Sequence, residues 1–205
     1  GKTDTASGLR GCCAMGLVRM NYPEVMAELA DLLADPESPA RIAAARAIAY
    51  CGSSQGVPLL RLKVRTGDKD PQVLAECFAG LLQLAPAQSL ALIAQFLAQP
   101  DEAIAEMAAL ALGESRVPEA FPVLHHCWQH TRYDNLKRTA LLAIAMLRQD
   151  EALQFLLSLV AQGKPDEAQE AIAVLGIYKQ DTVLWQQVCD AAQKRGDIAA
   201  QSNSD

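Results

Sequence analysis

Aromatic residues, histidine and net positive charge are all scarce in this chain. Only 5% of its 205 residues are aromatic, while 51% are hydrophobic. A core made of small side chains is typical of closely packed helices rather than of a large β-sandwich. The formal charge of −6 argues against a nucleic-acid surface, which usually needs a basic face.

Long apolar runs and paired-cysteine motifs are also missing. No uncharged apolar stretch is long enough to span a membrane, and no secretory signal is visible. The cysteines lie among apolar residues without C-x-x-C spacing, as reduced thiols in a core often do. We therefore expect a reducing compartment and a cytoplasmic protein.

Catalytic motifs are absent as well. The sequence contains no G-x-S-x-G, no H-E-x-x-H and no phosphate-binding glycine loop. Cys127 lies beside histidines, but nothing favours a nucleophilic role for it over chance. We expect no enzyme activity, no catalytic residue and no cofactor.

What the chain does contain is an internal repeat. Five segments align with starts 32, 32, 32 and 31 residues apart, and small residues fill the middle of each. Small residues allow helix backbones to approach closely, so each segment predicts a helix, called here helix A. The segments are ARIAAARAIA (40–49), QVLAECFAGL (72–81), IAEMAALALG (104–113), LKRTALLAIA (136–145) and EAQEAIAVLG (167–176).

A second set of segments follows the first. Their first, fourth and eighth positions are mostly apolar, which predicts one buried face on a second helix, helix B. These segments are VPLLRLKV (57–64), SLALIAQF (89–96), FPVLHHCW (121–128), LQFLLSLV (153–160) and LWQQVCDA (184–191). LRGCCAMG (9–16) and VMAELADL (25–32) form an earlier pair. We predict six two-helix units in a single domain at 6–196, with a flexible start at 1–5 and a disordered tail at 197–205.

Aspartate and proline mark the turns between units. Asp35, Asp70, Asp101, Asp134 and Asp166 precede the A segments. An aspartate at this place can accept hydrogen bonds from free backbone N–H groups at a helix start. The positions of these aspartates therefore agree with the helix boundaries that the repeat predicts.

This pattern resembles a HEAT-repeat protein, in particular the short bacterial form called the phycobilisome-lyase-type HEAT repeat. The resemblance is carried by Asp35-Pro36 with ARIAAARAIAYCG (40–52), and by IAEMAALALG (104–113) followed by a helix reaching His130. It implies an all-α, armadillo-type solenoid, a right-handed superhelix with A helices outside and B helices lining a concave groove. In that family helix A tends to open with Val-Arg; here only Arg10, Arg41 and Lys137 occupy the basic position.

All three histidines lie in LHHCWQH (124–130). The aligned positions make Leu124 and Trp128 core residues, whereas His126 and His130 lie one turn apart and face away from the core. That spacing makes the pair a weak candidate for zinc or nickel, because further ligands are needed and the aligned neighbours supply none. The alternatives are solvated histidines, or groove residues whose partner binding depends on pH.

RLKVRTGDK (61–69) is the one basic cluster on a B segment, suited to an acidic peptide or phosphate, though such clusters are more often solvated. Together with the small residues beside the histidines it completes our set of groove candidates. The set comprises Thr66, Arg61, Lys63, Arg65, Ala94, Ala98, His126, His130, Ser158 and Gln162.

The favoured hypothesis is a scaffold that binds a protein or peptide in its concave groove, as a monomer or a module of a longer chain. The alternative is a subunit of a HEAT-like enzyme, similar to a bilin lyase or to a helical-repeat DNA glycosylase. The lyase reading rests on the fold alone, and the glycosylase reading needs a basic groove that this acidic chain does not predict. Nucleic-acid and membrane partners are not expected.

Overall fold

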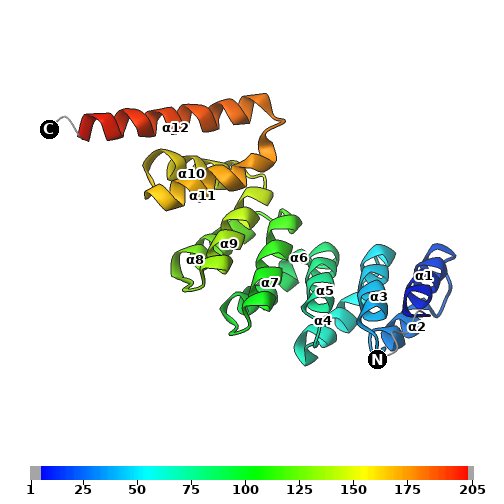
Figure 1. The fold of residues 1–205 in the computed structure, drawn as a ribbon. Coiled ribbons are helices and arrows are strands. Elements are labelled where there is room, and N and C mark those ends of the chain that lie inside the picture. The colour runs from blue at the N-terminus through cyan, green and yellow to red at the C-terminus, as the bar shows by residue number, and fades with distance from the viewer. Residues whose placement is uncertain (1–5, 203–205) are drawn as a thin grey trace. The chain divides into compact units, whose positions relative to one another are not determined.

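The computed structural model describes the backbone of residues 6–202 and the side chains of residues 6–196. Within this range the chain forms α-helices joined by short turns and no β-strand (Figure 1). The helices are α1 (Ala6–Arg19), α2 (Val25–Leu32), α3 (Ser38–Cys51), α4 (Gly56–Thr66), α5 (Pro71–Leu84), α6 (Pro86–Ala94), α7 (Glu102–Ser115), α8 (Ala120–His130), α9 (Asp134–Met146), α10 (Asp150–Gln162), α11 (Pro165–Leu175) and α12 (Thr182–Ser202). The predicted all-α class is confirmed, and the A and B helices alternate as the repeat predicts.

Two predicted helices end earlier than expected. The B segment at 89–96 is split, because α6 ends at Ala94 and a 3₁₀ turn, η1 (Gln95–Ala98), follows it. A second 3₁₀ turn, η2 (Gly176–Tyr178), replaces the last residue of the A segment at 167–176. Tight turns of this kind satisfy some of the carbonyls that a helix end leaves without partners.

The chain divides into two compact units, Gly1–Ala111 (unit 1) and Leu112–Asp205 (unit 2). The single domain at 6–196 stays a prediction. The predicted flexible start, 1–5, lies outside the described residues. The predicted tail, 197–205, begins inside α12, whose helical backbone continues to Ser202.

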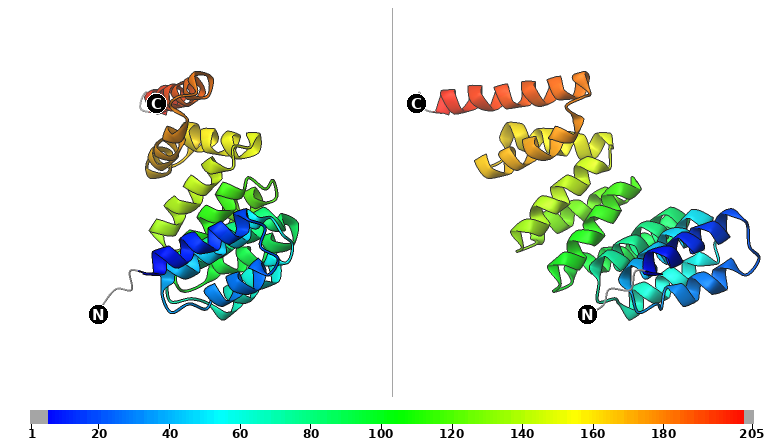
Figure 2. Two further views of the ribbon diagram at one scale, coloured as in Figure 1. Left: turned by 90° about the vertical axis from the view of Figure 1, so that its right-hand side faces the viewer. Right: turned by 45° about the vertical axis from the view of Figure 1, so that its right-hand side comes forward.

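In unit 1 the A helices α1, α3 and α5 stack side by side, and α2 and α4 pack against α3 and α5 (Figures 1 and 2). Small residues make this stacking possible: Ala44 and Ala45 on α3 are fully buried. At Gly80 of α5 an added Cβ would lie 2.8 Å from the Leu60 side chain and 3.2 Å from that of Ala49. The small central positions of the A segments are therefore a packing requirement.

In unit 2 the same arrangement recurs. Helix α9 packs against α8, α10 and α11, and α12 packs against α10. Ala140 and Ala143 of α9 are fully buried. An added Cβ at Gly113 would lie 2.6 Å from the backbone oxygen of Ala143, so this contact requires glycine.

The predicted aspartate caps form at some helices and not at others. Asp70 Oδ1 accepts the backbone N–H of Gln72 at 3.0 Å, and Asp101 Oδ1 accepts those of the next turn at 3.1 and 3.3 Å. Asp134 and Asp166 lie instead inside the first turns of α9 and α11. There they favour the helix start through its dipole rather than through a capping bond.

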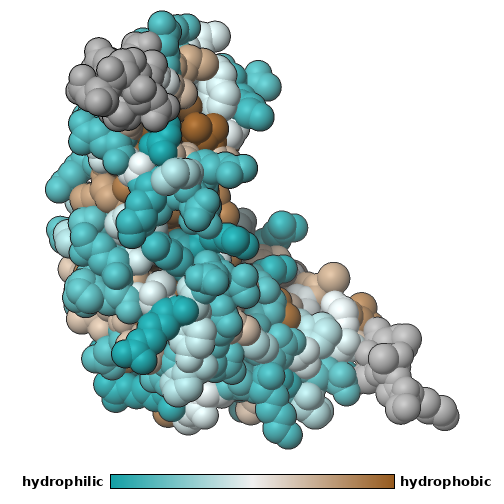
Figure 3. All heavy atoms as spheres, turned by 60° about the vertical axis from the view of Figure 1, so that its left-hand side comes forward, coloured by the Kyte–Doolittle hydropathy of each residue, from teal (hydrophilic) through white to brown (hydrophobic). Residues whose placement is uncertain are grey.

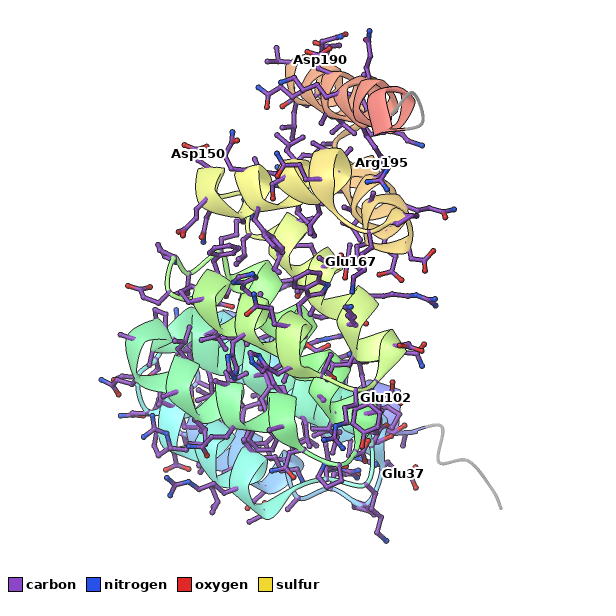
Figure 4. All side chains as sticks on the ribbon, turned by 90° about the vertical axis from the view of Figure 1, so that its left-hand side faces the viewer. Glu37, Glu102, Asp150, Glu167, Asp190 and Arg195 are labelled. Carbon is purple, nitrogen blue, oxygen red and sulfur yellow. The ribbon has the colours of Figure 1, made fainter. Side chains whose placement is uncertain are left out.

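Other acidic residues occupy helix starts in the same way. Figure 4 labels Glu102, Asp150 and Glu167, each in the first turn of its helix. Arg195, also labelled, donates from Nη1 to the backbone oxygen of Gly163 at 2.7 Å. This bond ties α12 to the turn that follows α10.

The described part of the chain contains no helix with the length and apolar character needed to cross a membrane. On the face shown in Figure 3, hydrophilic side chains predominate and hydrophobic ones are scattered among them. On this face the hydrophobic side chains do not form one large patch.

Candidate functional site

Asp68, in the turn between α4 and α5, receives two cations. Its side chain is 2% exposed and accepts hydrogen bonds from Arg41 Nε and Nη2, both at 2.7 Å. Lys63 Nζ lies 2.7 Å from the same carboxylate. Burial alone would raise the pKa of Asp68, but the hydrogen bonds from Arg41 and Lys63 outweigh it and hold the pKa well below its usual range. Lys63, a groove candidate, thus makes a structural contact within unit 1.

The basic position near the start of the A helices has the same structural role elsewhere. Arg10 Nε lies 2.8 Å from an Asp35 oxygen in the turn before α3, and Lys137 Nζ lies 3.6 Å from Glu167 in the first turn of α11. Each of these cations joins its own helix to the start of the next A helix. We therefore assign the column to repeat stacking rather than to ligand binding.

A cavity of about 750 Å³ lies in unit 1 between α4, α6, η1 and the start of α7. Three groove candidates from α4 line it: Arg61, Arg65 and Thr66. Its apolar lining comes mainly from Val64, Leu74, Leu92, Phe96 and Ile104, and its polar rim includes Gln88, Gln95, Gln99 and Asp101. Polar and apolar side chains thus share the lining, so the cavity offers both hydrogen bonding and apolar contact.

Arg61 is incompletely satisfied at this cavity. Its Nη2 reaches the backbone oxygen of Gln88 only at 3.4 Å, and its Nε–H is buried without an acceptor among the described residues. A buried donor without a partner costs free energy that a ligand oxygen would recover. Arg65 lies one helical turn further along α4 and is exposed, so both guanidinium groups occupy one face of the helix.

Two carboxylates also line the cavity, but both are already engaged. Asp68 is held by Arg41 and Lys63, and Asp101 caps the first turn of α7. Neither carboxylate forms an ion pair with Arg61 or Arg65, and Asp68 is already paired with two other cations. The cavity can accept an anionic group.

In unit 2 the His126 and His130 side chains are exposed on α8, as the repeat columns predict. Their rings stack with centroids 4.1 Å apart, and His130 Nδ1–H donates to the backbone oxygen of His126 at 2.9 Å. That bond leaves Nε2 of His130 as the nitrogen open to solvent. In the described part of the chain no three metal-binding side chains gather, so the pair lacks the further ligands that zinc requires.

The neighbouring residues of α8 are part of the core. Leu124 and Trp128 are buried, as predicted. His125 packs among aromatic rings, 5.6 Å from Phe121 and 4.6 Å from Phe155 between centroids, and burial lowers its pKa. This ring cluster is a packing feature.

Cys127 is poorly suited to nucleophilic catalysis. Its side chain is buried, and burial raises the pKa of its thiol to about 11. The reactive thiolate is therefore scarce at neutral pH. A cysteine in this environment behaves as a small core residue.

The remaining candidates take less distinctive places. In unit 1, Ala94 ends α6 and Ala98 ends η1, and neither lines the cavity. In unit 2, Ser158 and Gln162 are exposed on α10, and the Ser158 hydroxyl donates to the Phe155 backbone oxygen at 2.6 Å. The structure thus brings together Arg61, Arg65 and Thr66 in one site and His126 with His130 in another.

Sequence reasoning missed the glutamines of the cavity rim. Gln88, Gln95 and Gln99 lie seven and four residues apart, a spacing that would place them on one side of a continuous α-helix. In the structure Gln88 lies on α6, Gln95 begins η1 and Gln99 follows it. Their amides can both donate and accept hydrogen bonds, as a peptide backbone also does. This spacing was the signal that could have identified them.

The model of the family described as HEAT repeats matches residues 59–145 and, in a second overlapping match, residues 89–176. No curated protein matches the chain.

Proposed function

Since the chain belongs to the HEAT-repeat family, we propose that it is a non-catalytic module that binds a protein or peptide partner. HEAT repeats commonly mediate protein–protein interaction. Stacked repeats of this kind present long surfaces that suit extended partners. In this proposal the B helices face the partner and line a concave groove, with the A helices outside.

The observation that carries the proposal is the cavity of unit 1. Helices α4 and α6, with η1, supply most of its lining, and these are B elements of their repeats. Its polar rim and apolar floor offer both hydrogen bonding and burial to a partner side chain. The exposed pair His126 and His130, on the B helix α8, is proposed as a second contact.

The finer resemblance, to phycobilisome-lyase-type repeats, belongs to the proposal too. This resemblance keeps a subunit of a HEAT-like enzyme as the alternative hypothesis. Mixing the protein with a free bilin tests the bilin-lyase form of that hypothesis. A bilin absorption change that saturates with the protein favours the lyase reading over the scaffold reading.

Affinity capture followed by reconstitution tests the main proposal. A partner recovered from extract is purified, and its affinity is measured by isothermal titration for wild type and for two surface variants. The test variant is His126→Ala/His130→Ala on helix B, and the control is Glu114→Ala, an exposed residue of helix A. Weakening by the first and not by the second supports binding along the B helices, whereas the reverse contradicts it.

A further inference from the structure

We propose that the cavity of unit 1 binds an anionic side chain of an extended peptide, held between Arg61 and Arg65. The inference rests on the proposed function and adds the chemistry of the partner. It concerns residues of unit 1 alone, so it does not involve the histidines of unit 2.

The geometry of α4 supplies the anion contact. Arg61 and Arg65 lie four residues apart and therefore share one face of the helix, and both line the cavity. The planar guanidinium group presents paired N–H donors that fit the oxygens of a carboxylate or a phosphate. Arg61 has a buried Nε–H without an acceptor among the described residues, which an incoming oxygen would satisfy.

No acidic residue of the cavity lining pairs with Arg61 or Arg65 among the described residues. The acidic groups nearest in the lining, Asp68 and Asp101, are engaged by Arg41 with Lys63 and by the start of α7. Lys63 lies two residues from each arginine, so it points to another side of α4 and meets Asp68 instead. The network that buries Asp68 thus leaves the two arginines as the cationic groups of the cavity.

The rest of the lining favours a peptide over a free anion. Leu92 and Phe96 form an apolar floor beside the arginines, which a small inorganic ion leaves uncovered. Gln88, Gln95 and Gln99 place amides along the rim, where the N–H and C=O groups of an extended chain need partners. An acidic residue next to an apolar one matches this combination.

Selection from a random ten-residue peptide library on the immobilised full chain identifies ligands directly, before any cellular partner is isolated. The expected result is enrichment of peptides that carry aspartate or glutamate beside an apolar residue. A synthetic copy of an enriched peptide is then compared with copies in which the acidic residue is glutamine or phosphoserine. Tighter binding of the phosphoserine copy identifies phosphate as the natural anion, and tighter binding of the acidic copy identifies carboxylate.

Matched variants locate the site. Arg61→Gln/Arg65→Gln should lower the affinity for the acidic peptide about tenfold or more, because charge-assisted hydrogen bonds are lost. The control Lys69→Gln/Arg132→Gln removes the same charge from exposed positions outside the cavity and should have little effect. Arg61→Lys/Arg65→Lys keeps the charge without the paired donors, so its affinity for the acidic peptide should lie between those of the two other variants. Far-UV circular dichroism checks that every variant is folded.

The possible negative results distinguish failure of the anion site from failure of peptide binding. Enriched peptides that bind wild type and the Arg61→Gln/Arg65→Gln variant equally overturn the anion site and leave peptide binding standing. Enriched peptides without acidic residues overturn it as well. A library that yields no ligand for wild type overturns both the anion site and peptide binding as the proposed function.

Discussion

Replacing Asp68 by asparagine removes the charge that joins α3, α4 and the turn before α5. The carboxylate is 2% exposed and accepts two bonds from Arg41, one from Lys63 and the backbone N–H of Asp70 at 2.9 Å. Asparagine has nearly the same shape as aspartate, but an N–H₂ group replaces one of the two carboxylate oxygens. This hydrogen-bond donor would then face the donors of Arg41, Lys63 or Asp70. Asp68→Asn should therefore destabilise unit 1 strongly.

The magnitude follows from what is left behind. Removing one partner of a buried ion pair costs about 3–5 kcal/mol, because the other charge stays buried without compensation. The Arg41 and Lys63 side chains are 11% and 17% exposed, so water can still hydrate their charges in part. We therefore expect the lower end of that range, about 3 kcal/mol of unfolding free energy.

Urea unfolding followed by two signals measures this effect. Circular dichroism reports helices throughout the chain, while tryptophan fluorescence reports Trp128 and Trp185, which both lie in unit 2. Stability in repeat proteins is approximately a sum of local and neighbour contributions. Asp68→Asn should therefore lower the midpoint seen by circular dichroism more than the midpoint seen by fluorescence.

Glu76→Gln is the matched control. It removes the partner of Arg46, which is 58% exposed, and an exposed pair contributes only about 0.2–1 kcal/mol. Equal midpoints for the two variants would refute the reasoning, since burial of the pair would then not matter.

The pH dependence of stability gives an independent check. The lowered pKa of Asp68 adds stability that is full above the unfolded-state value, about 3.9, and is lost as the pH falls below it. The gap between wild type and Asp68→Asn should therefore narrow below about pH 4.

Three further predictions concern unit 2. Gly113→Ala should cost about 1–3 kcal/mol by urea unfolding, because its Cβ would lie 2.6 Å from the Ala143 oxygen; a gain from the better helix former would contradict this packing. Tyr178→Phe removes the hydroxyl that donates to the Ala145 backbone oxygen and should cost about 1 kcal/mol, and an unchanged urea midpoint would show that the bond is dispensable. Burial lowers the pKa of His125 in the folded state, so the unfolded state binds the proton more readily and stability should fall as the pH drops below about 6.5. His125→Gln should flatten that dependence in fluorescence-monitored urea unfolding, and an equally steep loss in the variant would place its origin elsewhere.

The fold was largely predictable because its information is local and periodic. The alanine-rich A segments, such as 40–49, predicted closely stacked helices, and Ala44 and Ala45 are indeed fully buried. The outward direction of His126 and His130 followed from their aligned columns and is confirmed by their exposure. The split of 89–96 at Ala94 carried no comparable periodic signal.

The candidate site was only partly predictable, because side-chain partners depend on contacts between repeats. The sequence grouped Lys63 with Arg61 and Arg65, yet residues two apart on a helix face different sides. Lys63 meets Asp68, and so does Arg41, which lies 27 residues before that carboxylate in the chain. No pattern within one segment indicates such a pairing.

The measurement that tests the central claim most directly is a side-chain footprint of the chain with its reconstituted partner. Hydroxyl-radical labelling, read by mass spectrometry, compares the accessibility of side chains with and without the partner. We predict protection on the B elements, at Phe96 in the cavity of unit 1 and at His126 and His130 of unit 2, with Tyr50 of the A helix α3 unprotected. Protection confined to Tyr50 and other A-helix residues would contradict binding along the B helices.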